Sequence, residues 1–242
     1  QLAQQRFTKY APKVMDVNRL FEPSVRAQKT GQPNTTQDSI TYRLAMTANG
    51  EYTQYHGGTV ADAMTEIVIM VNRLNDIFEV ELGVTLQLVD DNDQLIFTNA
   101  TTDPFNNDSQ DGDLNQTVTD NRIGTANYDI GHIVNTNGGG LAVLGALCWD
   151  GYKADGITGS GSPTNDAFWV DFVAHELGHQ FGANHTFNAT TGSCGGGNRE
   201  SEAAYEVGAG TTIMSYAGIC GEQNITGQVD DYYHVHSLNE MA

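Results

Sequence analysis

The sequence has 242 residues, of which 39% are hydrophobic, and this is enough to bury the core of one large domain or of two closely packed subdomains. Thirty acidic residues against 11 basic ones give a formal net charge of −19, which argues against nucleic acid or an anionic membrane as a partner because both would repel it. No run approaches the roughly 20 apolar residues that span a bilayer, so we expect a soluble protein, and a monomer.

The first half of the chain begins with a segment to which we assign no chemistry. Residues 1–38 combine basic, apolar and proline residues and pass into a polar stretch, which is typical of an irregular lead-in. The alternating pattern of residues 40–48 then predicts a strand. Residues 60–82 carry apolar side chains at helical spacing, so we expect a long helix that Gly83 terminates. Residues 84–89 predict a second strand.

The middle of the chain alternates short extended segments with polar stretches. We expect strands at residues 95–98, 128–134 and 141–147. Residues 90–121 are dense in Asp, Asn, Gly and Thr and predict a loop; their oxygen atoms suit a hard cation such as Ca²⁺, but their spacing does not match the twelve-residue calcium loop. A solvated loop is therefore the favoured interpretation, with calcium as an alternative. The side chains concerned are Asp103, Asn106, Asn107, Asp108, Asp111 and Asp113.

A helix predicted over residues 166–180 places two histidines on one face. His175 and His179 are four residues apart, and one helical turn of about 5.4 Å stacks their imidazole rings. Glu176 points to a different side of the helix, where it can reach a metal-bound water without binding the metal itself. The spacing predicts two metal ligands and a neighbouring general base.

Gly182 and His185 complete the predicted site. The helix must end sharply before the chain can return to the metal, and glycine adopts the required left-handed conformation at little cost. His185 then becomes a third ligand, and three neutral imidazoles leave a fourth position for water, as in catalytic zinc sites. Zinc lowers the pKa of its water toward about 7 and polarises a scissile carbonyl, while Glu176 accepts the water proton and passes it to the departing amine. The sequence thus predicts a hydrolase with one catalytic Zn²⁺.

The string from His175 to His185 resembles the extended motif of the metzincin metallopeptidases, His-Glu-x-x-His-x-x-Gly-x-x-His. Residues 212–216, Thr-Ile-Met-Ser-Tyr, look like the tight turn of that clan, which would place Met214 beneath the zinc. The resemblance covers roughly residues 40–242.

The resemblance implies an α+β catalytic domain of three layers at residues 39–242. An upper subdomain of about residues 39–182 would contain a twisted mixed sheet and long helices. A small irregular lower subdomain of about residues 183–242 would follow, with the zinc at the floor of a cleft between them.

The subfamily stays open. Residues 128–148 and 163–187 look most like bacterial members of the reprolysin, or adamalysin-like, family. Thr186, where animal reprolysins have an aspartate, resembles the pappalysin type, and Tyr216 resembles the astacin and serralysin turn. Tyr216 is equally compatible with a zinc ligand, a hydrogen-bond donor to the oxyanion and a packed aromatic residue. His132 is interpreted as a structural histidine on a strand rather than a catalytic one.

We expect an edge strand that precedes the motif in sequence to line the cleft. It consists of Gly139, Gly140, Leu141 and Ala142. Such a strand holds an extended peptide through main-chain hydrogen bonds, so protein or peptide substrates and endopeptidase activity are implied. Two alternatives are a binding module that keeps the fold without cleaving, against which the presence of Glu176 argues, and a zinc hydrolase of small amides.

The chain has three cysteines, Cys148, Cys194 and Cys220, whose spacing matches no zinc ribbon. We favour a disulfide between Cys194 and Cys220, over pairings with Cys148 or three reduced thiols. A disulfide that closes a loop is typical of extracellular proteins, so we expect secretion, with targeting and latency segments that were removed or lie outside this sequence.

Overall fold

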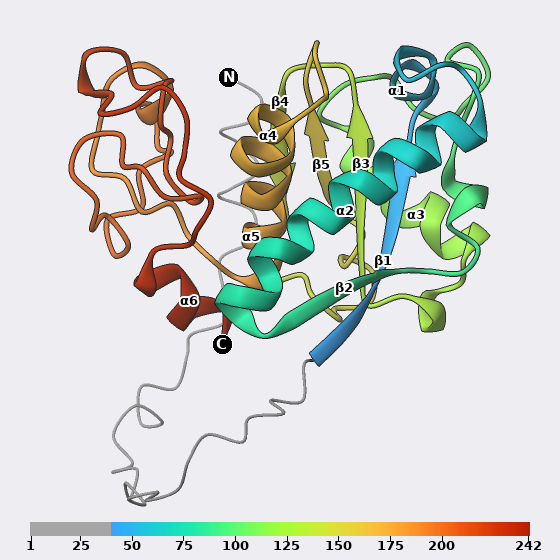
Figure 1. Cartoon of the computed structure of the whole chain (residues 1–242), viewed down its shortest axis with the longest axis horizontal. Coiled ribbons are helices and arrows are strands. Elements are labelled where there is room, and N and C mark those ends of the chain that lie inside the picture. Colours follow the sequence, from blue (N-terminus) through green and yellow to red (C-terminus); the bar gives the residue numbers. More distant parts are fainter. Residues whose placement is uncertain (1–39) are drawn as a thin grey trace, which may run out of the picture. The chain divides into compact units, whose positions relative to one another are not determined.

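The computed structural model describes residues 40–242. A five-stranded sheet in the order β2-β1-β3-β5-β4 forms its centre (Figure 1). The predicted lead-in at residues 1–38 lies outside the described residues. β1 pairs in parallel with β2 and β3, and β3 with β5, whereas β4 runs antiparallel along the edge. The sheet is therefore mixed, as predicted. The strands are β1 (Ile40–Ala48), β2 (Val84–Leu88), β3 (Ile130–Asn135), β4 (Gly139–Ala142) and β5 (Gly156–Gly159).

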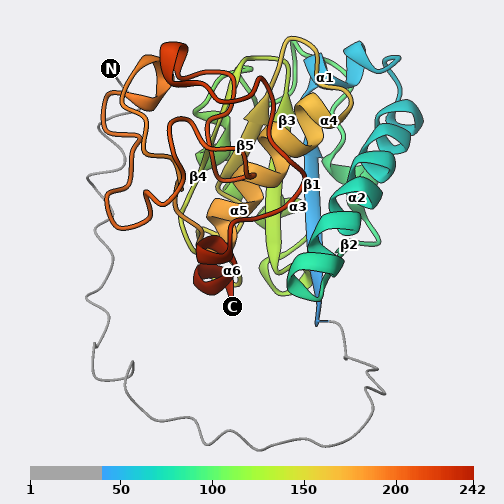
Figure 2. The same ribbon diagram turned by 60° about the vertical axis from the view of Figure 1, so that its left-hand side comes forward.

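Helices cover both faces of this sheet, which gives the three expected layers (Figures 1 and 2). The long helix α2 and the helix that carries the histidine motif pack on one face, and α3 packs on the other. The motif helix is continuous but changes geometry along its length, through α4, a π-helical segment and α5. The helices are α1 (Gly50–Tyr55), α2 (Val60–Leu82), α3 (Asp111–Arg122), α4 (Asp166–Phe168), the π-helical segment (Trp169–Ala174), α5 (His175–Phe181) and α6 (Val235–Met241).

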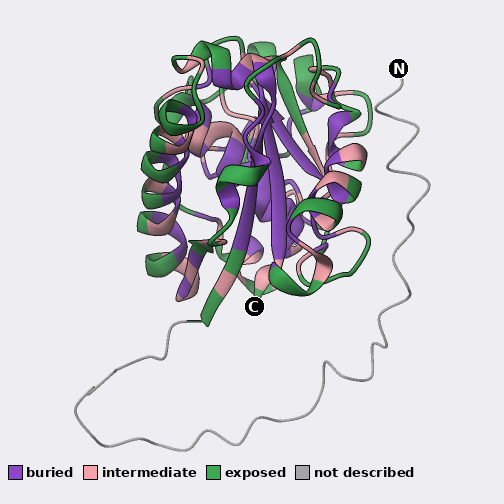
Figure 3. Ribbon diagram, turned by 90° about the vertical axis from the view of Figure 1, so that its right-hand side faces the viewer, coloured by how far each residue is buried: buried purple, intermediate pink, exposed green. Residues whose placement is uncertain are grey.

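The main core lies between the sheet and the face that carries α2 and α5. Alternate residues of β1 point into it, and the central strands are buried along most of their length, whereas the outer faces of the helices are exposed (Figure 3). Leu44 and Met46 of β1 are completely buried there, together with Leu177 of α5. At about 25 cal/mol per Å² of apolar surface removed from water, burial of this face is the main force that holds α5 in place. Gly83 ends α2 with φ 66°, as predicted.

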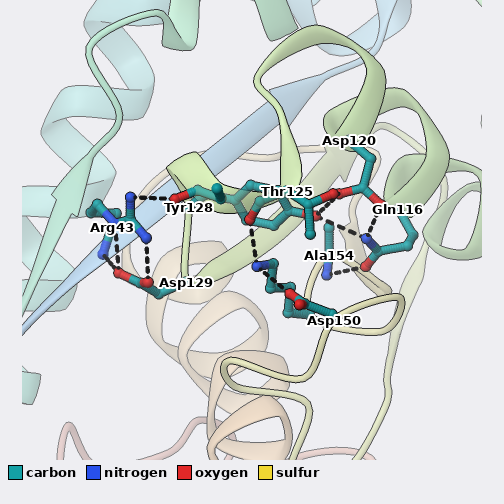
Figure 4. A network of polar contacts seen from close by, with 10 residues as sticks. Arg43, Gln116, Asp120, Thr125, Tyr128, Asp129, Asp150 and Ala154 are labelled. Atoms are coloured by element: carbon teal, nitrogen blue, oxygen red, sulfur yellow. Dashed lines mark hydrogen bonds and ion pairs between the residues drawn. The ribbon is translucent and has the colours of Figure 1, made fainter.

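The loop predicted for residues 90–121 is wrong in its second half, where α3 forms. This helix buries polar side chains, so its sequence has no apolar period: Gln116 donates to the hydroxyl of Tyr128 at 2.8 Å and accepts the backbone N–H of Ala154 at 2.7 Å (Figure 4). The Tyr128 hydroxyl in turn donates to Asp120 at 2.8 Å. These polar contacts fix α3 near the start of β3, together with the packing of Leu114 and Val118 against the sheet.

Four shorter elements also differ from expectation. The strand predicted at residues 95–98 is wrong: Leu95 ends a 3₁₀ turn at Asn92–Leu95, and Ile96 alone forms a bridge, to Ala48. The strand predicted at residues 141–147 is displaced to β4. The short elements α1 and β5 were not predicted, because neither is long enough to show a period.

Residues 183–242 contain little regular structure. They hold two 3₁₀ turns, at Gly192–Cys194 and Gly221–Gln223, an isolated bridge and α6. The predicted disulfide between Cys194 and Cys220 is present, with the two Cα atoms 5.2 Å apart, and Cys148 is an exposed free thiol. Within residues 40–242, no helix is long and apolar enough to cross a bilayer.

Candidate metal centre and active site

The three predicted histidines converge on one point. His175 and His179 lie one turn apart on α5, and Gly182, with φ 113°, ends the helix so that the chain turns back to His185. The Nε2 atom of His185 is 3.0 Å from Nε2 of His179 and 3.1 Å from Nε2 of His175. All three side chains are buried, and within residues 40–242 they are the one group of three or more side chains arranged to hold a metal ion.

The tautomer of each ring follows from its second hydrogen bond. Nδ1 of His175, His179 and His185 donates to the backbone oxygens of Ile213, Ala183 and Asn198, at 2.7, 2.7 and 2.6 Å. A carbonyl oxygen carries no proton, so each Nδ1 must be protonated and each Nε2 must present a lone pair. Nitrogens on one tetrahedral zinc ion would lie roughly 3.3 Å apart, close to the spacing found here. Such a donor set fits a divalent metal.

Burial also sets the charge of these rings. Desolvation lowers the pKa of His175 to about 3, with the neighbouring His179 adding to the effect, and lowers the pKa of His179 to about 4. The pKa of His185 is lowered well below its ordinary value for the same reason. All three imidazoles are therefore neutral at physiological pH, which is the state that binds metal.

Glu176 lies on the side of α5 that faces the edge strand β4. It is buried, and desolvation raises the pKa of its carboxyl to about 8 in the metal-free protein. A side-chain carbon placed at Gly140 would overlap the Glu176 carboxylate, so this glycine makes room for it. The structure therefore brings together two predicted site residues, 36 positions apart in sequence.

The strand β4 contains all four residues expected to line the cleft. It is the last strand in the sheet order, and all four residues pair with β5 on its inner side. Gly139 and Gly140 are exposed, and Leu141 and Ala142 are partly exposed. Its outer edge thus offers backbone groups beside Glu176.

Met214 lies in a tight turn that packs under α5. The side chain is completely buried, and a Cβ at Gly178 would come within 2.5 Å of its sulfur, so the turn and the helix are in close contact at a glycine. The backbone oxygen of Met214 accepts the N–H of Thr186 at 3.1 Å. The same turn supplies the carbonyl of Ile213 that orients His175.

Tyr216 packs against the metal centre. Its ring centroid lies 4.6 Å from that of His185 and 5.6 Å from that of His175, and it is tilted against Phe187 at 4.6 Å. Burial raises the pKa of its hydroxyl, and the nearby charge of Glu176 adds to the effect. The ring of Tyr216 therefore packs beside two of the predicted metal ligands.

Gln180 is a buried residue of the site that the sequence did not point to. Its Nε2 donates to the backbone oxygen of Gly131 at 2.8 Å, and its Oε1 lies 2.9 Å from Nδ1 of His132. Nε2 of His132 pairs with the hydroxyl of Thr158 at 2.8 Å, which confirms the structural role expected for this histidine. The available signal was a polar residue on the helix face that turns toward the sheet.

The acidic residues considered for calcium serve the backbone instead. Asp111 accepts the N–H groups of Asn106 and Asp108 at 2.8 and 3.1 Å. Asp103 accepts those of Gly50 and Phe105 at 2.6 and 3.0 Å. Across the described residues, these carboxylates form no group of three that could hold an ion.

Comparison with known proteins gives the family. The family described as Metallo-peptidase family M12B Reprolysin-like matches residues 38–242, and the chain belongs to it, which confirms the resemblance drawn from residues 128–148 and 163–187. No curated protein matches the chain.

Among solved structures, metalloproteinase-II from Bacteroides fragilis has 12% identity and a TM-score of 0.48, over 86% of this chain and 54% of its own. This chain thus spans about half the length of that protein. Myroilysin has 10% identity and a TM-score of 0.40, over 85% of this chain and 95% of its own.

Proposed function

We propose that this protein is a zinc-dependent endopeptidase. The observation that carries the proposal is the convergence of three Nε2 lone pairs, each fixed by a hydrogen bond from Nδ1 to a backbone carbonyl. His175, His179 and His185 would hold the ion and leave its remaining position open to water. Membership of a metallopeptidase family supports this assignment.

The chemistry follows from the surroundings of that point. Zinc, when bound, supplies a Lewis acid for the scissile carbonyl and lowers the pKa of water. Its charge also favours the ionised form of Glu176, whose pKa burial raises to about 8 in the metal-free protein. Glu176 then accepts the proton of the attacking water and delivers it to the leaving amine. In this proposal Tyr216, whose ring lies beside that of His185, donates its hydroxyl to the developing oxyanion.

The substrate is an extended segment of a protein or peptide. The outer edge of β4 can pair with such a segment as an additional strand, and since this edge lies beside Glu176, the pairing would bring the scissile bond near the base. A small amide would gain nothing from this edge. The disulfide between Cys194 and Cys220 favours a secreted protein, since disulfides persist in oxidising compartments.

Glu176→Ala tests the proposal. The unaltered protein should contain zinc, cut denatured casein and stop when a chelator is added. Glu176→Ala should keep its zinc and lose at least about 100-fold in cleavage rate, because it lacks the general base.

Glu222→Ala, at an exposed position within residues 183–242, is the matched control and should cut casein at the normal rate. Undiminished cleavage by Glu176→Ala would disprove the mechanism. A zinc-free protein with its three histidines intact would disprove the site. Tight zinc binding without any cleavage by the unaltered protein would favour the binding module.

A further inference from the structure

The carboxylate of Glu206 collects four hydrogen bonds from two separate segments. Its Oε1 accepts the hydroxyls of Thr186 and Thr212, both at 2.5 Å. Its Oε2 accepts the backbone N–H groups of Thr211 and Thr212, at 2.7 and 3.1 Å. Thr186 directly follows His185, and Thr212 opens the turn that carries Met214. One side chain therefore joins the third histidine to that turn.

The backbone reinforces the same junction. The N–H of Glu206 donates to the oxygen of Thr186 at 2.8 Å, and Phe187 and Glu206 form a parallel bridge. The N–H of Thr186 donates in turn to the oxygen of Met214 at 3.1 Å. Thr186 thus has Glu206 on one side and the Met214 turn on the other, with no regular sheet or helix to fix it.

The charge of Glu206 determines which group donates. The residue is half-buried; desolvation acts to raise its pKa, but the hydrogen bonds from Thr186, Thr212 and Thr211 outweigh it and lower the pKa. An ionised carboxylate can only accept, so both threonine hydroxyls must point their protons at it. Glutamine has the same shape but only one oxygen, and its NH₂ group would face donors.

We propose that Glu206 is a positioning residue for the metal centre. Through Thr186 it fixes the backbone of His185, and through Thr211 and Thr212 it fixes the turn whose Ile213 carbonyl orients His175. This inference rests on the proposed zinc site. Groups that orient metal ligands typically contribute about 10-fold to 100-fold in metal affinity.

The test measures zinc binding rather than proteolysis. Metal-free protein is titrated with zinc against a chromophoric chelator, and the visible spectrum of the cobalt-substituted protein reports the geometry of the ligands. Glu206→Gln should bind zinc at least about 10-fold more weakly and show an altered cobalt spectrum. Glu222→Gln, at an exposed position of the same region, should match the unaltered protein in both. A purely stabilising role would lower the melting temperature without changing the cobalt spectrum.

A threonine pair keeps the test decisive if Glu206→Gln does not fold. Thr186→Val removes the hydroxyl and should weaken zinc binding, whereas Thr186→Ser keeps it and should restore the affinity. Unchanged affinity and spectrum in Glu206→Gln, or equal effects of Val and Ser at position 186, would overturn the inference while leaving the zinc site intact. Failure of the unaltered protein to bind zinc would instead overturn the proposed function, and this inference with it.

Discussion

Two regions of the protein build the metal centre in different ways. The sheet region, residues 40–182, supplies His175, His179 and Glu176 from a helix whose apolar face is buried against the sheet. The C-terminal region, residues 183–242, supplies His185 from a segment without regular structure. The first region holds its ligands by packing, and the second by individual hydrogen bonds.

In the C-terminal region, each contact is specific to a few atoms. Glu240 of α6 accepts the backbone N–H of Asn184 at 2.9 Å and its side-chain amide at 2.7 Å, and so fixes the residue that precedes His185. The carbonyl of Asn198 orients the ring of His185, and Asn198 lies within the loop that the disulfide closes. Loss of one such contact should displace one ligand, whereas the sheet region should respond as a unit.

The largest effect on activity is expected where β4 of the sheet region contacts Glu176. Gly140→Ala places a methyl group on the Glu176 carboxylate, so either the base or β4 must move. We expect cleavage of casein to fall by on the order of 100-fold, since a shift of about 1 Å in a reacting group has effects of this size. Zinc content should not change.

Gly138→Ala provides the control for this substitution. A Cβ at Gly138 meets no heavy atom within 4 Å, so its activity should equal that of the unaltered protein. Equal activities of the two variants would show that Glu176 is not confined by β4.

The largest effect on stability is expected at Gln180, which joins the motif helix to the sheet. Gln180→Leu removes the partner of His132 Nδ1 and a donor to the Gly131 carbonyl, both buried. A buried polar group left without a partner costs about 1–3 kcal/mol, so the free energy of unfolding should fall by about 3–4 kcal/mol in urea titrations. Gln87→Leu, at an exposed position of β2, should change it by less than about 0.5 kcal/mol. Equally small effects would show that packing alone holds the helix.

Removal of the disulfide should separate the two regions. The two cysteines are 26 residues apart in sequence, so the disulfide restricts the unfolded chain. In the double variant Cys194→Ser and Cys220→Ser, the free energy of unfolding should fall by about 3 kcal/mol, because the unfolded chain gains entropy. Amide hydrogen exchange should accelerate in residues 186–224 and stay unchanged in β1 and β3. Cys148→Ser, which alters the exposed free thiol, serves as the control. Uniform acceleration across the chain would show that the regions unfold together.

The same contrast explains what the sequence could predict. The strand at residues 40–48 and the helix at residues 60–82 have clear periods, and the histidine spacing on α5 follows from helix geometry alone. The glycine at position 182 predicts the turn after α5, because glycine tolerates a positive φ. Gln116 and Glu206 belong to no recognisable hydrophobic pattern. Their roles depend on hydrogen-bond partners that are distant in sequence and that only the fold brings near. α3 and the support of His185 were therefore not predicted.

The smallest expected effect concerns Asp171, which connects the two regions from the π-helical segment. Burial raises the pKa of this carboxyl to about 6, the charge of Asp166 adds to the effect, and a hydrogen bond from the backbone of Val229 opposes it. Because the pKa in the folded protein lies above the ordinary value of 3.8, the folded state binds the proton more tightly than the unfolded state. The contribution to stability is complete below about pH 4 and is lost as the pH rises to about 6.

Asp171→Asn removes this titration and keeps an oxygen that can accept from Val229. Relative to the unaltered protein, the variant should gain about 1–2 kcal/mol in the free energy of unfolding at pH 7.5 compared with pH 4, measured by urea titration at both pH values. Gln87→Asn, an exposed substitution that involves no titratable group, should show no such dependence. A gain of the same size at both pH values would mean that the carboxyl titrates normally, and that the contact with Val229, rather than the burial of Asp171, sets the stability of this junction.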